Sequence, residues 1–494
     1  MPTLGNKHAS ARRIFYPRFD GGLNLTVSPE MLAKNELRDA LNVEVSQTTG
    51  KLKVRGGLVW RNRCPLGEGD NVKDIIPIHG SEDFFILSEQ NNLYHYSNGV
   101  IHDTKIRYSS RVKNVSAVMW DDSILLASGF PLVKLTISNG TYEYSGIYSS
   151  PNSRYVFVRS GRVGVVDGEN TIRFSAVGDC ENWEEDPDDD STGKFIEIGY
   201  KDGMVINTIC PLSKDLIIFK SSTTSPDNGT IWRLIGDYPN WQVVEAVHNS
   251  GTYNYKTVKT VGNDIFYITE SGLASLSTVM EYGDVKMRWA DRKIAKVLTE
   301  LITSSAQLWN VPIKSQLWLI PSEEDNLVWV FDYALGIWSY FEFPQLPKYV
   351  LCVHNNVLVF IDNDIYELND YCYQDEMKDS EPQTIKGRIV LGVLSAGHHI
   401  LVKSAYASYE TNTTSQAELC VGGFRMPLKY RGNGNFIYDD YDIAYEDNDP
   451  LIEMNAMMTT RQRCIVRGWT LSPEIKISGG GFELSTLAFE TVEV

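Results

Sequence analysis

The side chains best able to do chemistry in this chain are its carboxylates, histidines and cysteines, and their spacing limits what they can do. The sequence holds neither the GxSxG turn of serine hydrolases nor the GxxxxGK[ST] loop that cradles phosphates. Its nearest dinucleotide-type segment, GNGNFI from Gly432, lacks the third glycine and a following helix. The sequence therefore indicates neither a serine hydrolase nor a phosphate-loop or dinucleotide-binding enzyme.

Two acidic segments have the composition of a cation site but not its spacing. The run EEDPDDD from Glu184 to Asp190 lacks the spaced ligands and the central glycine of a calcium loop. The segment DNDIYELND has Glu367 where an EF-hand requires glycine, and Tyr373 stands where the bidentate Glu belongs. We expect a solvated acidic loop at the first segment and a hairpin at the second.

The histidines and cysteines are too dispersed for a metal centre. The adjacent pair His398 and His399 would point to opposite sides of a strand. No CxxC pair occurs, so we expect free thiols at the seven cysteines, Cys64, Cys180, Cys210, Cys352, Cys372, Cys420 and Cys464. We predict no catalytic, cofactor-binding or metal-ligating residue, no cofactor and no enzymatic activity.

Composition indicates a folded, β-rich and acidic chain. Of its 494 residues 43% are hydrophobic and 11% aromatic, and the aromatic residues favour strands. The formal charge of -17 argues against broad adhesion to nucleic acid or anionic membranes. The polar start has no apolar signal segment, and no stretch approaches the roughly 18 apolar residues of a membrane helix. We therefore expect synthesis in the cytoplasm and no membrane-spanning segment.

An apolar strand signal recurs seven times between residues 81 and 370. Its starting residues are Asp83, Asp122, Arg162, Asp215, Asp264, Gln316 and Asn356. A propeller blade of four short strands takes roughly 40 to 50 residues, so the spacing predicts a mainly β protein with a propeller of six or seven blades. An antiparallel sandwich is the alternative, but its strands usually recur without a larger unit.

The remaining segments suggest how the chain is divided. Residues 61–370 form the predicted propeller, with a helical insertion near 291–305 whose apolar stripe we expect to pack in the core. After a polar stretch, residues 371–494 return to strand-like alternation and predict a C-terminal β domain. Residues 1–60 do not match the repeat, and we expect an arm or a part of that second domain.

Three parts of the sequence resemble a known family. The segment from Phe19 to Trp60 resembles the opening of tail proteins from short-tailed bacteriophages, through Gly21, Gly22, Asn24, Pro29, Asn35, Asn42, Val43, Gly50, Leu52, Arg55 and Gly57. A second phrase resembles the family's FSxxGDxxNW, through Arg173, Phe174, Ser175, Gly178, Asp179, Asn182 and Trp183. A third match lies in DLIIFKSS from Asp215, IWRLIGDYPNW from Ile231 and ITESGLASLS from Ile268, so the three together cover about residues 19–280, whereas residues 371–494 match only loosely. Glycine and asparagine favour turns, so we expect turn roles in the first phrase more than subunit contacts.

The family is the tail hub or nozzle, also called the packaged-DNA stabilisation protein. The resemblance implies a structural virion protein in the tail that forms a homohexameric ring below the portal and adaptor. Such a ring continues the DNA channel without sequence-specific binding, retains packaged DNA and anchors fibres, spikes or a needle. Because a ring that passes DNA should not grip phosphates, we also expect an acidic lumen.

Two alternatives come from other functional classes. A glycan-binding or glycan-cleaving propeller would stack sugars on Trp318, Trp329 and Trp338 and use paired carboxylates. These tryptophans alternate with aliphatic residues, so we expect them in the blade cores instead. A monomeric attachment protein at the tail tip would use the same propeller without a closed ring.

Overall fold

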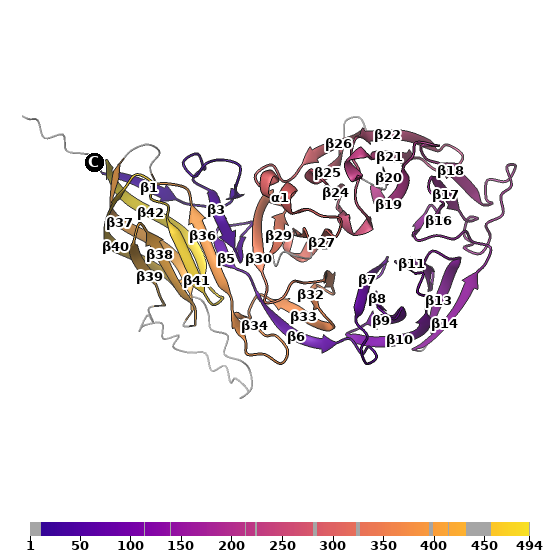
Figure 1. Cartoon of the computed structure of the whole chain (residues 1–494), viewed down its shortest axis with the longest axis horizontal. Coiled ribbons are helices and arrows are strands. Elements are labelled where there is room, and N and C mark those ends of the chain that lie inside the picture. The colour runs from indigo at the N-terminus through magenta and orange to yellow at the C-terminus, as the bar shows by residue number, and fades with distance from the viewer. Residues whose placement is uncertain are drawn as a thin grey trace, which may run out of the picture.

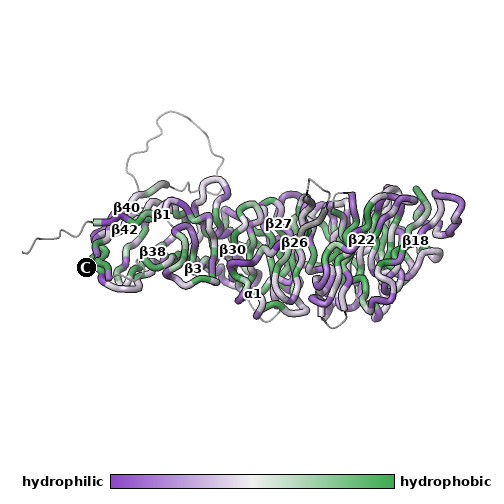
Figure 2. Tube along the Cα trace, turned by 90° about the horizontal axis from the view of Figure 1, so that it is seen from above, coloured by the Kyte–Doolittle hydropathy of each residue, from purple (hydrophilic) through white to green (hydrophobic). Residues whose placement is uncertain are grey.

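A ring of β-sheets occupies one end of the molecule and a two-layered β domain the other (Figure 1). The structure is a computed structural model that describes residues 11–493 except 113, 139, 213, 223–224, 280–283, 323–326, 395–398, 413 and 431–455. Seen from above, the two parts lie end to end in a flat, elongated body (Figure 2).

The ring consists of seven antiparallel blades of four strands each. The first three are β7 (Val72–His79), β8 (Phe84–Ser88), β9 (Asn92–Ser97) and β10 (Val100–Arg107); β11 (Ser116–Trp120), β12 (Ser123–Ala127), β13 (Leu132–Ser138) and β14 (Thr141–Ile147); and β15 (Val156–Arg159), β16 (Arg162–Asp167), β17 (Thr171–Phe174) and β18 (Lys194–Glu197). The innermost strands β7 and β11 also pair in parallel, which joins the first two blades into one sheet.

The other blades follow in chain order. They are β19 (Val205–Leu212), β20 (Asp215–Ser221), β21 (Thr230–Ile235) and β22 (Gln242–His248); β23 (Val258–Val261), β24 (Asp264–Thr269), β25 (Gly272–Val279) and β26 (Asp284–Trp289); β27 (Gln307–Val311), β28 (Gln316–Ile320), β29 (Leu327–Asp332) and β30 (Ile337–Glu342); and β31 (Tyr349–Val353), β32 (Asn356–Ile361), β33 (Asp364–Asn369) and β6 (Gly57–Arg63). Short 3-10 turns, η1 (Pro226–Asn228), η2 (Tyr255–Thr257) and η3 (Pro312–Lys314), lie in the connections.

The predicted fold class, a mainly β propeller with a further β-rich part, is confirmed. Each of the seven apolar signals corresponds to the second strand of a blade, as in β8, where all five residues are buried. A second strand has sheet neighbours on both sides and blades against both faces, so it reads as a continuous apolar run instead of an alternating one. The repeat in the sequence is therefore one buried strand per blade.

The last blade is closed by a strand from the other end of the chain. Strand β6 pairs antiparallel with β33, for example Leu58 with Leu368. The sequence boundary placed between residues 60 and 61 thus falls inside a propeller strand. Because closure joins residues about 300 positions apart, it ties the N-terminal segment to the end of the ring.

The second part is a sandwich of two sheets, built from both ends of the chain. One sheet runs β4 (Val43–Val45), β5 (Leu52–Val54), β42 (Glu483–Glu493), β37 (Ile400–Thr411) and β40 (Ala456–Gly468), and β1 (Arg12–Tyr16) also pairs with β42. The other runs β3 (Glu36–Leu41), β36 (Lys386–Leu391), β41 (Glu474–Ser478), β38 (Gln416–Val421) and β39 (Phe424–Leu428), with β2 (Gly22–Leu23) beside β3. A separate pair, β34 (Gln374–Asp375) and β35 (Gln383–Thr384), lies in the connection from the propeller.

One sheet runs without interruption from the propeller into the sandwich. Strand β3 pairs on one side with β30, the outer strand of the sixth blade, through Leu41 and Tyr340. On its other side β3 pairs with β36 of the sandwich. The largest hydrophobic core contains residues of both parts, including Trp338 and Leu391. The two parts are therefore joined by shared backbone pairing and a shared core.

The helix α1 (Ala295–Leu301) is shorter than the predicted 291–305 and lies between the fifth and sixth blades. Ile294 and Leu298 are fully buried in the largest core, and Val297, Leu301 and Ile302 pack against it. The apolar stripe thus packs in the core. Among the described residues, no helix is both long and apolar enough to cross a membrane.

Candidate functional site

The first family-like phrase lies where the propeller meets the sandwich, and Asn42 is its central polar residue. The Asn42 side chain accepts hydrogen bonds from Arg55 Nε (3.0 Å) and the Glu342 backbone N–H (2.8 Å), and it donates to the Lys386 carbonyl (2.9 Å). Its φ of 54° is a left-handed conformation that Asn adopts more readily than most residues. One side chain therefore links the sixth blade, strand β36 of the sandwich and Arg55.

Arg55 is buried and forms a bidentate ion pair with Asp375. Its Nη1 and Nη2 donate to the two Asp375 carboxylate oxygens at 2.9 and 2.7 Å. The remaining donors reach Asn42 and the carbonyls of Gly56 and Glu342, so all five guanidinium N–H groups are satisfied. The guanidinium also lies 4.3 Å from the ring centre of Phe343. Such pairing compensates the cost of burying both charges.

Two glycines of the phrase allow backbones to approach closely at this junction. A Cβ on Gly57 would lie 2.0 Å from the Gln374 carbonyl oxygen, and a Cβ on Gly22 would lie 2.5 Å from the Ile337 side chain. Gly22 also has a φ of 62°, which favours glycine. A side chain at Gly22 would push the N-terminal segment away from the sixth blade, and one at Gly57 would push the closing strand β6 away from the connection at Gln374.

The other residues of the phrase hold the same segment in place. Asn24 bonds Glu36 and Asn35 bonds Asp20, while Val43 and Leu52 are buried in the shared core. We predicted that the glycines and asparagines form turns. In the structure some of them, such as Asn42 and Gly57, are also buried where the propeller meets the sandwich. The sequence did not single out Asp375, because it lies in the polar stretch that we interpreted as a boundary.

The second phrase forms the turn between β17 and β18. Buried Ser175 accepts from the Val163 N–H and donates to the Ala176 carbonyl, and Trp183 Nε1 donates to the Cys180 carbonyl (2.9 Å). Gly178 has a φ of 73°, and its N–H donates to the Gly161 carbonyl. The phrase is therefore a folded turn that carries the acidic run after it.

We call the run Glu184–Asp190 the acidic loop. Two buried cations, Lys194 and Arg162, hold its backbone: Lys194 Nζ donates to the carbonyls of Asp186 and Asp189, and Arg162 donates to that of Asp190. Every residue of the loop is exposed. Because the cations bind carbonyls, the loop has a fixed shape while its side chains are exposed, as the sequence predicted, and Glu185 pairs with Arg173 (2.8 Å).

The central axis of the propeller is crossed by the turn η2. Tyr255 Oη donates to Asp74 Oδ2 (2.6 Å), and Lys256 Nζ lies 2.9 Å from Asp74 Oδ1. Lys256 also lies 4.9 Å from the ring centre of Tyr349, and the rings of Tyr255 and Tyr155 are 6.3 Å apart. These contacts join a turn before the fifth blade to the first, third and seventh blades, so the turn must span the axis.

Burial around this turn shifts the protonation of nearby groups. Desolvation lowers the pKa of Lys259 to about 8 and, with the Asp74 charge, raises the pKa of Tyr255. Glycoside hydrolysis needs two carboxyl groups flanking the substrate. Asp74 instead has both oxygens engaged by Tyr255 and Lys256, so the cluster is a closed ion-pair network. Sequence spacing offered no sign of it, because its members are up to 275 positions apart.

The side chains considered for sugar binding are in the blade cores, as expected. Trp318, Trp329 and Trp338 are 0, 3 and 2% exposed. Trp318 Nε1 donates to Gln316 and Trp338 Nε1 to the Ala290 carbonyl. A sugar cannot stack on rings that are buried in this way.

The remaining candidate groups form no centre in the described residues. His399 packs its ring 5.4 Å from that of Trp469, and His398 and the Gly432 segment lie outside the described residues. The seven cysteines are free thiols, and the segment around Glu367 is the hairpin of β32 and β33, as predicted. No group of three His, Cys, Asp or Glu side chains within the described ranges is arranged to hold a metal ion.

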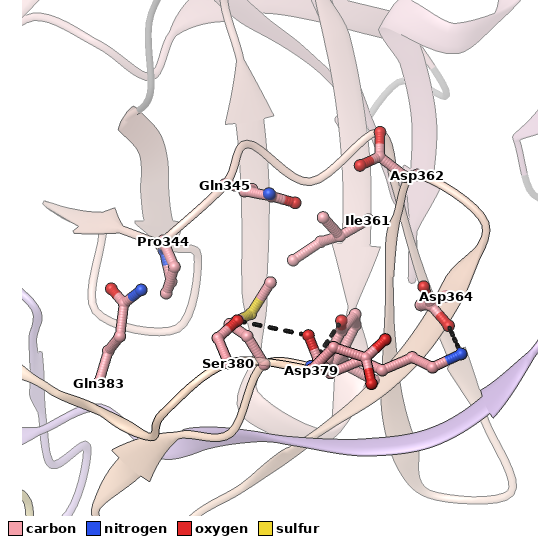
Figure 3. Close-up of a pocket in the computed structure, with 11 residues that line it drawn as sticks. Pro344, Gln345, Ile361, Asp362, Asp364, Asp379, Ser380 and Gln383 are labelled. Carbon is pink, nitrogen blue, oxygen red and sulfur yellow. Dashed lines mark hydrogen bonds and ion pairs between the residues drawn. The ribbon is translucent and has the colours of Figure 1, made fainter.

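A polar cavity of about 240 Å³ lies beside the closing blade (Figure 3). Two of the three carboxylates that line it have partners: Asp364 lies 3.6 Å from Lys378 and accepts from Trp60 Nε1 (3.1 Å), and Asp362 lies 3.5 Å from Lys348. The cavity is therefore a polar recess between the last blade and the connection to the sandwich.

Comparison with known proteins finds likeness in fold alone. No family model matches the chain, and no curated protein matches it in sequence. Among solved structures, BamB from Moraxella catarrhalis is similar with a TM-score of 0.38 and 9% identity, over 76% of this chain and 99% of that chain. The N-terminal domain of Nup159 is similar with a TM-score of 0.37 and 8% identity, over 67% and 98%.

An enzyme is also among the similar structures. The exo-beta-1,3-galactanase from Phanerochaete chrysosporium has a TM-score of 0.30 and 9% identity, over 88% of this chain and 100% of that chain. Likenesses at this level carry no argument about activity.

Proposed function

We propose that this chain is a structural tail protein of a short-tailed bacteriophage, a hub or nozzle subunit without enzymatic activity. Six copies form a ring below the portal and adaptor, and the ring retains packaged DNA, conducts it during ejection and anchors distal fibres, spikes or a needle. The chain is made in the host cytoplasm and resides in the virion tail.

The observation that carries this proposal is the position of the family-like phrase. Three of its residues, Asn42, Arg55 and Gly57, meet at one buried junction that joins the closing blade, the sixth blade and the sandwich. A chance resemblance would leave such residues scattered over unrelated loops. Their gathering at one junction supports the view that the phrase marks a shared architecture, and thereby the role that the resemblance implies.

The charge distribution fits a ring that passes DNA. Residues 61–370 contain 26 Lys and Arg against 41 Asp and Glu, which gives -15 of the net -17. A surface of this sign makes few counterion-releasing contacts with phosphates, so a duplex can slide past it. Since η2 crosses the axis of each propeller, the DNA path in the proposed ring is the lumen between copies, and we expect it to be acidic.

The test is the symmetry of the purified full chain. Native mass spectrometry and class averages from negative-stain images at high concentration should give six copies and a sixfold ring. A chain that remains monomeric at every concentration contradicts the ring and favours an attachment protein. A map of the ring with a lumen lined mostly by Lys and Arg contradicts the acidic lumen, and specific cleavage in a glycan screen contradicts the absence of enzymatic activity.

A further inference from the structure

The outer face of the sandwich is basic and aromatic on a chain that is acidic overall. Along the edge strand β40, Arg461, Arg463, Ile465 and Arg467 occupy alternate positions and are exposed, whereas Cys464 between two of them is buried. We use the name arginine face for the surface formed by half-buried Tyr406 and the exposed residues Arg13, Phe15, Lys403, Arg461, Arg463, Ile465, Arg467 and Trp469.

Stacked side chains organise the centre of the arginine face. The guanidinium groups of Arg13 and Arg461 lie 5.3 and 4.9 Å from the ring centre of Tyr406. Arg461 lies 3.7 Å from Glu490, which is the acidic neighbour within the face. Ile465 and Trp469 are 66 and 61% exposed. Arginine and aromatic side chains with exposed apolar area are the composition of protein interfaces, and arginine pairs well with carboxylates.

A surface of complementary charge lies on the same chain, at its other end. The acidic loop carries six carboxylates, of which Glu185 already pairs with Arg173, on a backbone fixed by Lys194 and Arg162. In Figure 1 the blade of β16, β17 and β18 is at the end of the long axis opposite to β37 and β40. The two surfaces cannot meet within one copy, but they can meet between copies.

We propose that the arginine face of one copy binds the acidic loop of the next copy, and that this contact links the subunits of the ring. The contact is heterologous, because it joins two different surfaces, and such contacts generate closed rings when the rotation between copies closes. The inference rests on the proposed function for the closure into a ring. The fixed loop backbone limits the entropy lost on binding.

Charge reversal on each side tests this contact in the full chain. One variant carries Arg463→Glu and Arg467→Glu, and a second carries Asp188→Lys and Asp190→Lys. We expect each variant alone to associate at least about tenfold more weakly than the unchanged chain in sedimentation velocity, because like charges would then face each other. An equimolar mixture of the two variants should recover association, and high salt should weaken it.

A matched control carries Arg425→Glu and Lys476→Glu, which reverse two exposed charges on the other sheet of the sandwich. It should associate as the unchanged chain does. A ring that forms equally well from either charge-reversed variant, or a mixture that does not recover, overturns the contact and leaves the proposed function standing. An unchanged chain that stays monomeric overturns both the ring and the contact.

Discussion

At the junction between the propeller and the sandwich, Arg55 is 1% exposed and every one of its N–H groups has an acceptor. On the arginine face, Arg463 and Arg467 are exposed and form no ion pair with another described residue. Arginine thus has two different roles in this chain. When it is buried it can have only one arrangement of partners, and when it is exposed it remains available to another molecule.

A change of charge should affect folding at the buried Arg55 pair and association at the arginine face. Removing one member of a buried pair leaves an uncompensated charge, which costs several kcal/mol. Changing an exposed charge costs little, because water already solvates it. The variants below probe these two regimes in order of expected effect.

Arg55→Ala should have the largest effect on stability. It leaves the Asp375 carboxylate buried without its bidentate partner, and we expect the free energy of unfolding to fall by about 3 to 5 kcal/mol. Urea denaturation measures the change. The control is Arg61→Ala, which removes a half-exposed pair with Glu367 and should cost at most about 1 kcal/mol. Equal losses in the two variants would contradict the structural role of the Arg55 pair.

Asp291 extends the comparison to a buried carboxylate without a cation in the described structure. It accepts a hydrogen bond from the Leu273 N–H, and burial raises its pKa to about 6. The folded protein therefore holds this proton more tightly than the unfolded chain, so the associated stability is complete below about pH 4 and is lost as the pH rises through about 6.

Asp291→Asn should remove this pH dependence. Between about pH 4 and pH 7 the stability of the variant relative to the unchanged chain should rise by about 3 kcal/mol, which is the equivalent of a pKa shift of about two. Thermal or urea unfolding across this range measures it, with the exposed Asp122→Asn as the control. A relative stability that does not change with pH would show that Asp291 ionises as freely in the folded state as in the unfolded chain.

Gly57→Ala probes the close approach of backbones at the junction. The new Cβ would lie 2.0 Å from the Gln374 carbonyl oxygen, so the closing strand must shift, and we expect a loss of about 1 to 3 kcal/mol. A Cβ on Gly67 would meet no neighbouring atom within 4 Å, and Gly67→Ala is therefore the control. A loss at Gly67 as large as that at Gly57 would contradict the steric explanation.

Some of this architecture follows from local sequence and some does not. A buried second strand such as β20, with Leu216 to Phe219 in succession, leaves a short apolar run that is visible without any partner. The repeat of such runs therefore predicts the propeller. The closing strand β6 leaves no such mark, because only its first two residues, Gly57 and Leu58, are buried and its partner β33 is about 300 residues away.

The polar contacts were harder to foresee for the same reason. The phrase around Asn42 and Arg55 drew attention as a resemblance, but its partner Asp375 lies 320 positions from Arg55 in an ordinary polar stretch. The axis network of Asp74, Tyr255 and Lys256 has no spacing signal at all. Periodicity predicts which strands are buried. Ion pairs between distant segments depend instead on how the closed propeller brings those segments together.

The smallest effect on folding should come from the arginine face itself. Arg463→Glu changes an exposed side chain on the outer surface of β40, so we expect the free energy of unfolding of the monomer to change by no more than about 0.5 kcal/mol. Urea denaturation at high salt and low protein concentration isolates this quantity, since association is then weakest. A loss of unfolding free energy comparable to that of Arg55→Ala would mean that Arg463 stabilises the fold. It would contradict the view that buried arginines stabilise the fold and exposed ones do not.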